Sequence, residues 1–117
     1  MPLSFALTYP ERLPSTVAPL NWAEVSRLDF GPPDRRKFPC IDLAYKAIAM
    51  GGTAPAVLND ADEVVVQAFL DRKIPFSDIP RIIAATLEAH TVQPASSVEA
   101  ILQADSWGRH EARRRLG

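Results

Sequence analysis

The densest group of side chains able to bind a cation is the acidic cluster Asp60, Asp62 and Glu63. Divalent metal ions prefer oxygen ligands, provided that several of them converge on one point. On a helix, residues 60 and 63 share a face whereas residue 62 points away, and no glycine turn or later glutamate completes a calcium loop. We therefore expect these acids to lie near a helix N-terminus, where the helix dipole stabilises negative charge, with metal binding as the alternative.

Cys40 is the single cysteine, and it falls in the first turn of a predicted helix, where the dipole lowers a thiol pKa. A cysteine nucleophile needs a histidine base, and nothing in the spacing brings His90 or His110 to it. The sequence favours a buried, inert cysteine. We expect His90 to end a helix, where partial positive charge is favoured, and His110, which lies among charged residues, to be solvated.

Arg109 and the run Arg113, Arg114 and Arg115 form a basic turn near the C-terminus. Phosphate or nucleic-acid binding is one interpretation. The other is that cations are favoured at helix C-termini, and the run is short and lacks interleaved aromatic residues. We prefer the second, and we expect Trp107 to close the core as a lid, with an interface anchor as the alternative.

Length and composition indicate one domain, or one small domain with a tail, because the chain has 117 residues and an apolar fraction of 47%. The net charge of -1 argues against a general nucleic-acid binder. No apolar run approaches the roughly 20 residues of a membrane span, and no secretory signal is evident. A lone thiol suits a reducing compartment, so we expect a cytoplasmic protein without nucleic-acid or membrane partners.

The elements that position these residues change character at Pro39. Seven of the eleven prolines lie within the first 39 residues, so residues 1–37 are predicted to be mostly extended or irregular. Within them, Asn21 is predicted to cap a short turn in which Trp22 is an apolar anchor. The alternating residues 27–30 are predicted to form a short strand or an extended edge segment.

Residues 38–117 carry helical periodicity throughout. The predicted helices run from 39 to 50, from after Thr53 to about 71, from near Ser77 to about 90 and from a capping box between Ser96 and Glu99. A break near residues 105–106 then precedes a last helix that ends near Leu116. The predicted buried faces, in chain order, are Ile41, Ala44, Tyr45 and Ile48; Leu58, Ala61, Val65 and Ala68, widened by Val57, Val64 and Phe69; Ile79, Ile82, Ile83 and Thr86; and Val98, Ile101 and Leu102.

Gly108 weakens the last helix by roughly 1 kcal/mol relative to alanine, and the i, i+4 pairs Asp105/Arg109 and Glu111/Arg115 partly offset this loss. Because the connections are short, successive helices should be antiparallel neighbours. The sequence therefore predicts an all-α fold: a small bundle of four to five helices (38–117) with an extended, proline-rich N-terminal arm (1–37).

Phe38-Pro39-Cys40 is an aromatic-Pro-Cys sequence at the start of a predicted helix, and residues 58–63 are Leu-Asn-Asp-Ala-Asp-Glu. These motifs, in this order, resemble the C-terminal part of the 1-deoxy-D-xylulose 5-phosphate (DXP) reductoisomerase family, which has an aromatic-Pro-Cys helix start and the sequence Leu-Asn-Ala-Ala-Asn-Glu. Further pieces that continue the resemblance are residues 7–12, 28–30, 33–34, 68–70, 76–79 and 104–105.

The resemblance implies a role as part of a larger enzyme. Full-length members rearrange and reduce DXP with NADPH and a divalent metal (Mg or Mn), in the non-mevalonate route to isoprenoids. They comprise a nucleotide-binding domain, a central domain with the metal, the substrate and much of the homodimer contact, and a helical domain that braces both. The resemblance carries no catalytic, cofactor-binding or metal-binding residue onto this chain, so we expect the chain to be inactive alone and its partners to be the missing domains.

Asp60 and Asp62 depart from the family pattern, which has alanine and asparagine there. A carboxylate buried without a partner is costly, so these two residues put normal docking in question. A stand-alone helical interaction module, which would use apolar surface left bare by missing partners, is the alternative function. A nucleic-acid binder that uses the C-terminal arginines is a third.

Overall fold

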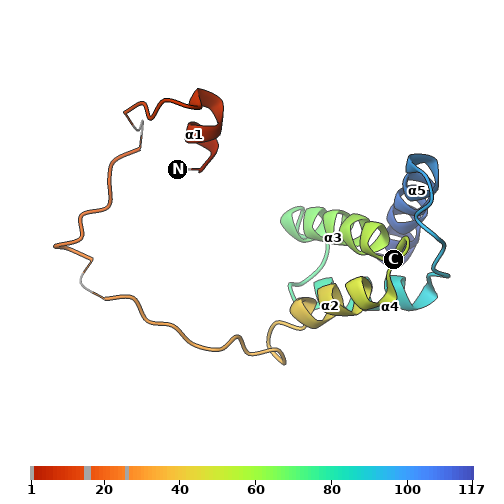
Figure 1. The fold of residues 1–117 in the computed structure, drawn as a ribbon. Helices are drawn as coiled ribbons and strands as arrows, with labels where there is room; N and C mark the ends of the chain where they lie inside the picture. The colour runs from red at the N-terminus through yellow and green to blue at the C-terminus, as the bar shows by residue number, and fades with distance from the viewer. Residues whose placement is uncertain (1, 15–16, 26) are drawn as a thin grey trace. The chain divides into compact units, whose positions relative to one another are not determined.

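The computed structural model describes residues 2–14, 17–25 and 27–117. In these ranges the chain has five helices and no strand, which confirms the all-α prediction: α1 (Pro2–Thr8), α2 (Cys40–Met50), α3 (Ala54–Leu70), α4 (Asp78–Ala89) and α5 (Val98–Arg114) (Figure 1). The chain divides into two compact units, Met1–Pro32 and Pro33–Gly117. None of the helices in the described residues combines the length and the apolar character that a membrane span requires.

The first unit begins with a helix that the sequence analysis missed. α1 forms because proline is tolerated in a first turn and the next proline comes only at residue 10. The rings of Phe5 and Tyr9, four residues apart, meet edge to face with centroids 5.7 Å apart. The Arg12 guanidinium lies 4.5 Å from the Phe5 ring centroid. Residues 1–37 are therefore not irregular throughout.

Among the described residues that follow α1 in the first unit, a turn forms after Asn21. Asn21 Oδ1 accepts a hydrogen bond from the N–H of Ala23 at 3.1 Å, and its carbonyl accepts from Val25 at 3.0 Å, which confirms the predicted turn. Trp22 is 72% exposed, so it is not buried within this chain. Residues 27–30 are neither helix nor strand, so of the two predicted alternatives, a short strand or an extended edge segment, the strand is not formed by this chain alone.

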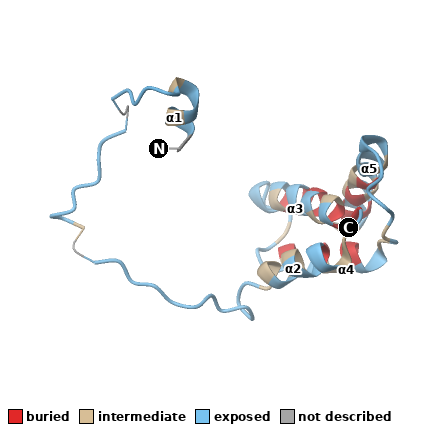
Figure 2. Cartoon of the chain, in the orientation of Figure 1, coloured by how far each residue is buried: buried red, intermediate tan, exposed pale blue. Residues whose placement is uncertain are grey.

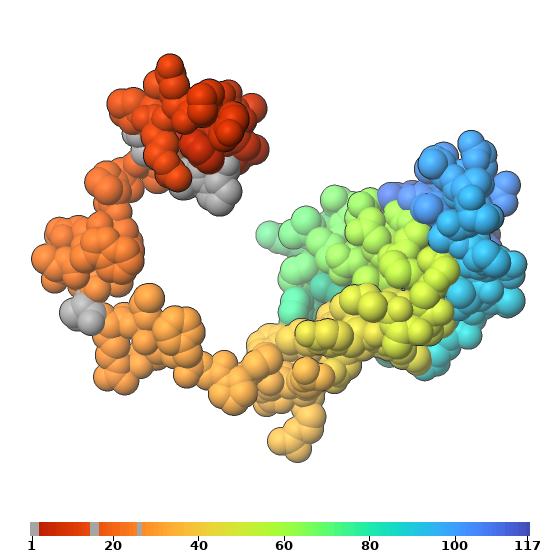
Figure 3. Space-filling view, in the orientation of Figure 1, coloured from red at the N-terminus to blue at the C-terminus, as the bar shows by residue number. Residues whose placement is uncertain are grey.

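The second unit is built around α3, which contacts α2, α4 and α5, while α4 also contacts α2 and α5. Burial is concentrated on the facing sides of these helices (Figure 2), and the space-filling view shows their side chains closing the gaps between the ribbons (Figure 3). The predicted face of α4 is buried, as is that of α3 except for half-buried Leu58 and for Phe69, which is 36% exposed. The buried core comprises Ala47, Val57, Ala61, Val64, Val65, Ile79, Ile82, Ile83, Leu87, Ala104 and Ala112.

The predicted buried face of α2 is wrong for Tyr45 and Ile48, whereas Ile41 and Ala44 are half-buried. Tyr45 and Ile48 are 62% and 69% exposed, whereas Cys40, Leu43 and Ala47 pack against the core. Apolar residues occur on more than one side of this helix, so the periodicity fits more than one rotation about the helix axis. The rotation observed leaves an apolar face uncovered.

The end of the chain also differs from the prediction. α5 continues through residues 105–106 without a break, because Asp105 directs its carboxylate to side chains and leaves the backbone hydrogen bonds of the helix intact. The residues predicted to face inward, Val98, Ile101 and Leu102, are 67%, 39% and 59% exposed.

The buried residues of α5 are instead the small residues Ala104, Gly108 and Ala112, together with Glu111. A Cβ at Gly108 would lie 3.2 Å from the Cα of Val57, so glycine permits the close approach of the two helices.

The predicted caps are only partly correct. Ser97, not Ser96, caps α5, because its hydroxyl accepts a hydrogen bond from the N–H of Ala100 at 3.2 Å. Thr53 and Ser77 occupy the N-cap positions of α3 and α4, but neither makes a side-chain cap hydrogen bond. α2 stops as predicted at Gly51 and Gly52, whose φ values are 69° and 50°.

Candidate functional site

Arg109 on α5 gathers three carboxylates at the α3–α5 interface. Its Nη2 donates to Asp60 Oδ1 at 2.6 Å and to Glu63 Oε2 at 2.7 Å, and its Nε donates to Asp105 Oδ2 at 3.3 Å. Residues 60 and 63 share a face, as the sequence predicted, and Asp62 is not part of the group. Asp60 is only 2% exposed, but Arg109 is its charged partner, so it is not the unpaired buried carboxylate that the sequence analysis considered.

The same geometry answers the metal alternative for this cluster. The oxygens that a divalent ion would need are directed at the guanidinium of Arg109. Throughout the described ranges, no group of three or more His, Cys, Asp and Glu residues is arranged to hold a metal ion. These residues therefore fit a structural ion-pair network and do not fit a cation site.

Asp60 titrates abnormally because of this environment. Burial raises the pKa of Asp60 to about 6, and the hydrogen bond and negative charge of Asp105 add to the shift, while Arg109 opposes it. The pKa of Asp105 is correspondingly lowered, mainly by its hydrogen bond from Asp60 and then by Arg109. Both facts indicate that Asp60 holds a proton toward Asp105 more readily than an ordinary carboxyl would.

A second polar group joins the loops at the ends of α3 and α4. The Oγ1 of Thr53 lies 2.8 Å from His90 Nε2 and accepts a hydrogen bond from the N–H of Gln93 at 3.1 Å, while the Thr53 N–H donates to the Gln93 carbonyl at 3.0 Å. Thr53 is 1% exposed. His90 ends α4 as predicted, its ring lies 4.9 Å from that of Trp107, and burial lowers its pKa.

Beside this group is a cavity of about 490 Å³. Trp107 lines it and also packs on the core, which agrees with the predicted lid. The lining contains no Asp, Glu, Lys or Arg; besides His90 it includes Thr53, Gln93, Ser96 and Gln103.

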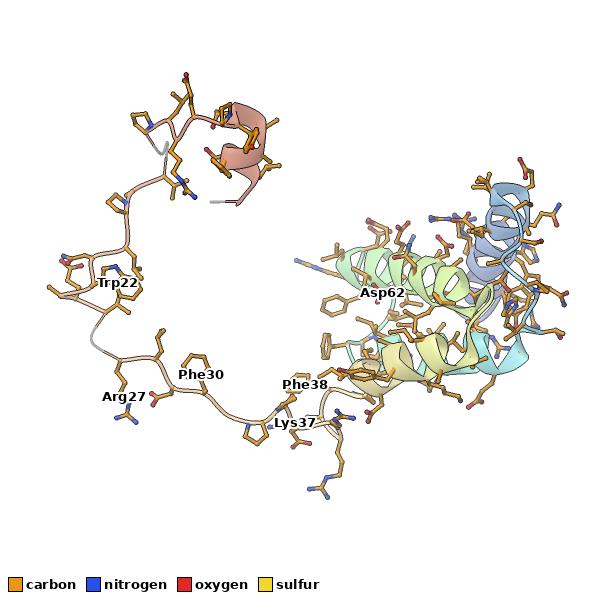
Figure 4. The ribbon with its side chains drawn as sticks, in the orientation of Figure 1. Trp22, Arg27, Phe30, Lys37, Phe38 and Asp62 are labelled. Atoms are coloured by element: carbon orange, nitrogen blue, oxygen red, sulfur yellow. The ribbon has the colours of Figure 1, made fainter. Side chains whose placement is uncertain are left out.

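Cys40 lies in a smaller cavity of about 210 Å³ that Asp62 also lines; Figure 4 labels Asp62 on α3. Burial, assisted by the negative charge of Asp62, raises the pKa of the Cys40 thiol. A raised pKa disfavours the thiolate, so the helix-dipole effect anticipated from the sequence does not dominate. His110 is exposed, as predicted.

The C-terminal arginines are largely occupied by Glu111. Its Oε1 lies 2.7 Å from Arg114 Nη2 and 2.6 Å from Arg115 Nη2, the second of which is the predicted i, i+4 pair. Arg109 is held by its three carboxylates. This pairing supports the helix-terminus interpretation of the basic run over phosphate binding.

The sequence analysis did not predict the two polar contacts that join distant parts of this unit, namely Asp60 with Arg109 and Thr53 with Gln93. The Asp60–Arg109 pair had a signal, because Asp60 continues the buried spacing of Val57, Ala61 and Val64 and so had to find a partner. The Thr53–Gln93 contact joins residues 40 positions apart and has no local signal.

Comparison with known proteins gives one consistent result. The family model for the DXP reductoisomerase C-terminal domain matches residues 1–111. The 1-deoxy-D-xylulose 5-phosphate reductoisomerase of Thermodesulfovibrio yellowstonii is 47% identical over 116 residues, which are 99% of this chain and 30% of that protein. That of Anaeromyxobacter dehalogenans is 48% identical with the same two coverages.

Solved structures agree with the sequence comparison. The reductoisomerase from Zymomonas mobilis in complex with NADPH aligns with a TM-score of 0.85 at 36% identity, covering 98% of this chain and 30% of that one. A DOX-P reductoisomerase with fosmidomycin and magnesium aligns at 0.86 and 38% identity, covering 98% and 31%. The chain thus spans about 30% of the length of the curated relatives that it matches.

Proposed function

Because this chain belongs to the family of DXP reductoisomerase C-terminal domains, we propose that it works as the bracing C-terminal segment of such an enzyme. The whole enzyme would convert DXP to 2-C-methyl-D-erythritol 4-phosphate with NADPH, as a step of isoprenoid synthesis. Residues 1–37 would be the arm that follows the central domain, and residues 38–117 the helical domain. The observation that carries the proposal is the 98–99% coverage of this chain by relatives three times as long.

The chemistry would be supplied by polypeptide beyond these 117 residues. Relatives have been solved with NADPH and with magnesium. Here the Arg109 cluster does not fit a cation, because its carboxylates already face a guanidinium. We therefore assign no catalytic, nucleotide-binding or metal-binding role to any residue of this segment, and we expect no turnover from it alone.

Exposed apolar side chains support docking onto a larger body. In the first unit Leu7, Trp22 and Phe30 are 80%, 72% and 91% exposed. Exposed apolar surface of this extent is typical of interaction sites. The partners would be the nucleotide-binding and central parts of the enzyme, in a cytoplasmic homodimer.

A graft tests this function. The last 30% of the Thermodesulfovibrio yellowstonii enzyme is replaced by this chain, and NADPH oxidation is followed with DXP and magnesium. We expect turnover from the graft and none from the isolated chain or from the truncated relative. Turnover by the isolated chain would refute the proposal that the catalytic residues lie outside this segment. A well-folded graft without turnover would refute the bracing role.

A stand-alone interaction module is the second candidate, and the bare faces of α2 and α5 favour it. Light scattering on the isolated chain distinguishes the two. A molar mass that corresponds to a discrete oligomer at micromolar concentration favours the module. The molar mass of a monomer at high concentration argues against it.

A further inference from the structure

Residues 27–30 of the first unit have two chemically different faces. Arg27 Nε donates to Asp29 Oδ1 at 2.7 Å, which keeps the two charged side chains on one side of the chain. Leu28 and Phe30 alternate with them and are 64% and 91% exposed. Figure 4 shows the side chains of Arg27 and Phe30 pointing to opposite sides of the backbone. This period-2 arrangement is that of a strand with one face to be buried.

The backbone of the same four residues is available for pairing. Among the described residues, no backbone–backbone hydrogen bond outside the helices involves residues 27–30, and since none of the four is proline, each carries an N–H donor. If a partner covers Leu28 and Phe30, the adjacent N–H and C=O groups leave water and must be paired. The free edge of a β-sheet offers a regular row of such partners.

The flanking sequence limits how far such pairing extends. Gly31, Pro32 and Pro33 follow directly, and proline cannot donate to a strand ladder. A strand here would be short, near the lower end of the usual range of about 3–10 residues.

We propose that residues 27–30 add as a short edge strand to a β-sheet in the part of the enzyme that this chain does not contain, with Leu28 and Phe30 packed into that part and Arg27 and Asp29 in solvent. This inference rests on the proposed function, because the partner belongs to the other 70% or so of the relatives' length. Addition of an extended segment to a free sheet edge is a common recognition mode.

Hydrogen exchange resolved to single amides tests the strand, in the isolated chain and in the graft onto the Thermodesulfovibrio yellowstonii enzyme. An edge strand pairs along one side only, so alternate amides are protected. We expect two of the four amides, two residues apart, to exchange about 100-fold or more slowly in the graft than in the isolated chain. Protection of all four would place the segment inside a sheet and contradict an edge strand.

Two serine substitutions in the graft separate the faces. Phe30→Ser removes the apolar contact and should abolish most of the protection over residues 27–30. The matched variant Arg27→Ser alters the solvent face and should retain it. Equal loss in both variants, or in neither, would overturn the assignment of faces.

Measurements on the graft also separate the edge-strand proposal from the proposed bracing function on which it rests. If the graft oxidises NADPH with DXP while all four amides exchange as in the isolated chain, the strand is refuted and the bracing function stands. If two alternate amides are protected but no turnover occurs, docking is supported and the bracing function fails. Free exchange without turnover rejects both.

Discussion

The guanidinium of Arg109 on α5 lies 2.6 Å from the carboxylate of Asp60 on α3, joining residues 49 positions apart. Asp60 stands where the family pattern suggested alanine, and Arg109, which is half-buried, gives this buried carboxyl group a charged partner. Without Arg109 the ionised form of Asp60 would be buried and unpaired, which is costly. The contact therefore makes the packing of α5 on α3 depend on a charge as well as on shape.

Asp60→Asn should alter how stability depends on pH. The pKa of Asp60 is about 6 in the folded chain, against an ordinary value of 3.8. A group with a raised folded pKa stabilises the fold most when it is protonated, so its contribution is present below pH 3.8 and is lost as pH rises through about 6. In urea unfolding between pH 4 and pH 8, wild type should lose stability relative to the variant as pH rises. Parallel profiles would contradict this.

His90→Gln should have the opposite signature. Burial lowers the pKa of His90 below its ordinary 6.5, so protonation opposes folding. Its contribution is full above pH 6.5 and is lost as pH falls through the folded pKa. Wild type should lose stability relative to His90→Gln when urea midpoints are compared at pH 7.5 and pH 5.5. A variant that loses as much as wild type over that interval would show that His90 is not the group responsible.

Thr53→Val should destabilise the second unit by about 1–3 kcal/mol. The change keeps the shape of the buried side chain but removes the hydroxyl that accepts a hydrogen bond from the Gln93 N–H and lies 2.8 Å from His90 Nε2, and a polar group left without its partner in a partly buried site costs about this much. Thr91→Val, on an exposed residue of the same cavity, is the control and should stay within about 0.5 kcal/mol of wild type. Chemical denaturation measures both, and similar losses would point to a general effect of valine there.

Gly52→Ala should be far more damaging than Gly51→Ala. Both residues have positive φ, which costs a side chain about 1–2 kcal/mol. A Cβ at Gly52 would also overlap the Gln93 carbonyl oxygen, whereas nothing lies within 4 Å of one at Gly51. We expect the Gly52 variant to lose a further 1–3 kcal/mol or so from overpacking. Thermal unfolding of the pair provides the comparison, and equal midpoints would contradict the overlap.

Gly108→Ala should destabilise the chain despite favouring the helix. Alanine gains about 1 kcal/mol of helix propensity, but its Cβ would press on the Val57 backbone, with 3.2 Å to Cα and 3.3 Å to the carbonyl oxygen. Overpacking costs typically about 1–3 kcal/mol, so the net result is a loss of up to about 2 kcal/mol in urea unfolding. Ser106→Ala, exposed on the same helix, should be neutral or slightly stabilising. A more stable Gly108→Ala protein would mean that α5 moves away without penalty.

The sequence predicted the helices well where proline, glycine and apolar spacing agree. Pro39, Gly51 and Gly52 bound α2 as expected, and the regular spacing of Ile79, Ile82 and Ile83 identified the buried face of α4. Local signals of this kind act over one or two turns, which is the range that sequence reading covers.

The errors have a common physical origin in contacts between distant residues. The buried positions of α5 are mostly alanine and glycine, whose small size suits close approach but gives little hydrophobic signal, while Val98, Ile101 and Leu102 are exposed. On α2, likewise, the large apolar residues Tyr45 and Ile48 are exposed although the apolar spacing predicted that they would be buried. In the candidate site, the acids 60 and 63 were grouped correctly, but their partner on α5 follows only from tertiary structure.

Because α3 contacts α2, α4 and α5, its position determines which parts of the chain a protease can remove without disrupting the second unit. None of the helix-to-helix contacts in the second unit uses residues before Pro33, so a protease that trims the chain to that point removes none of them. A cut within residues 54–70, by contrast, disrupts α3, the helix against which α2, α4 and α5 all pack. Digestion of the native protein should therefore stop at one resistant fragment that contains all four helices, with no stable intermediate of two or three.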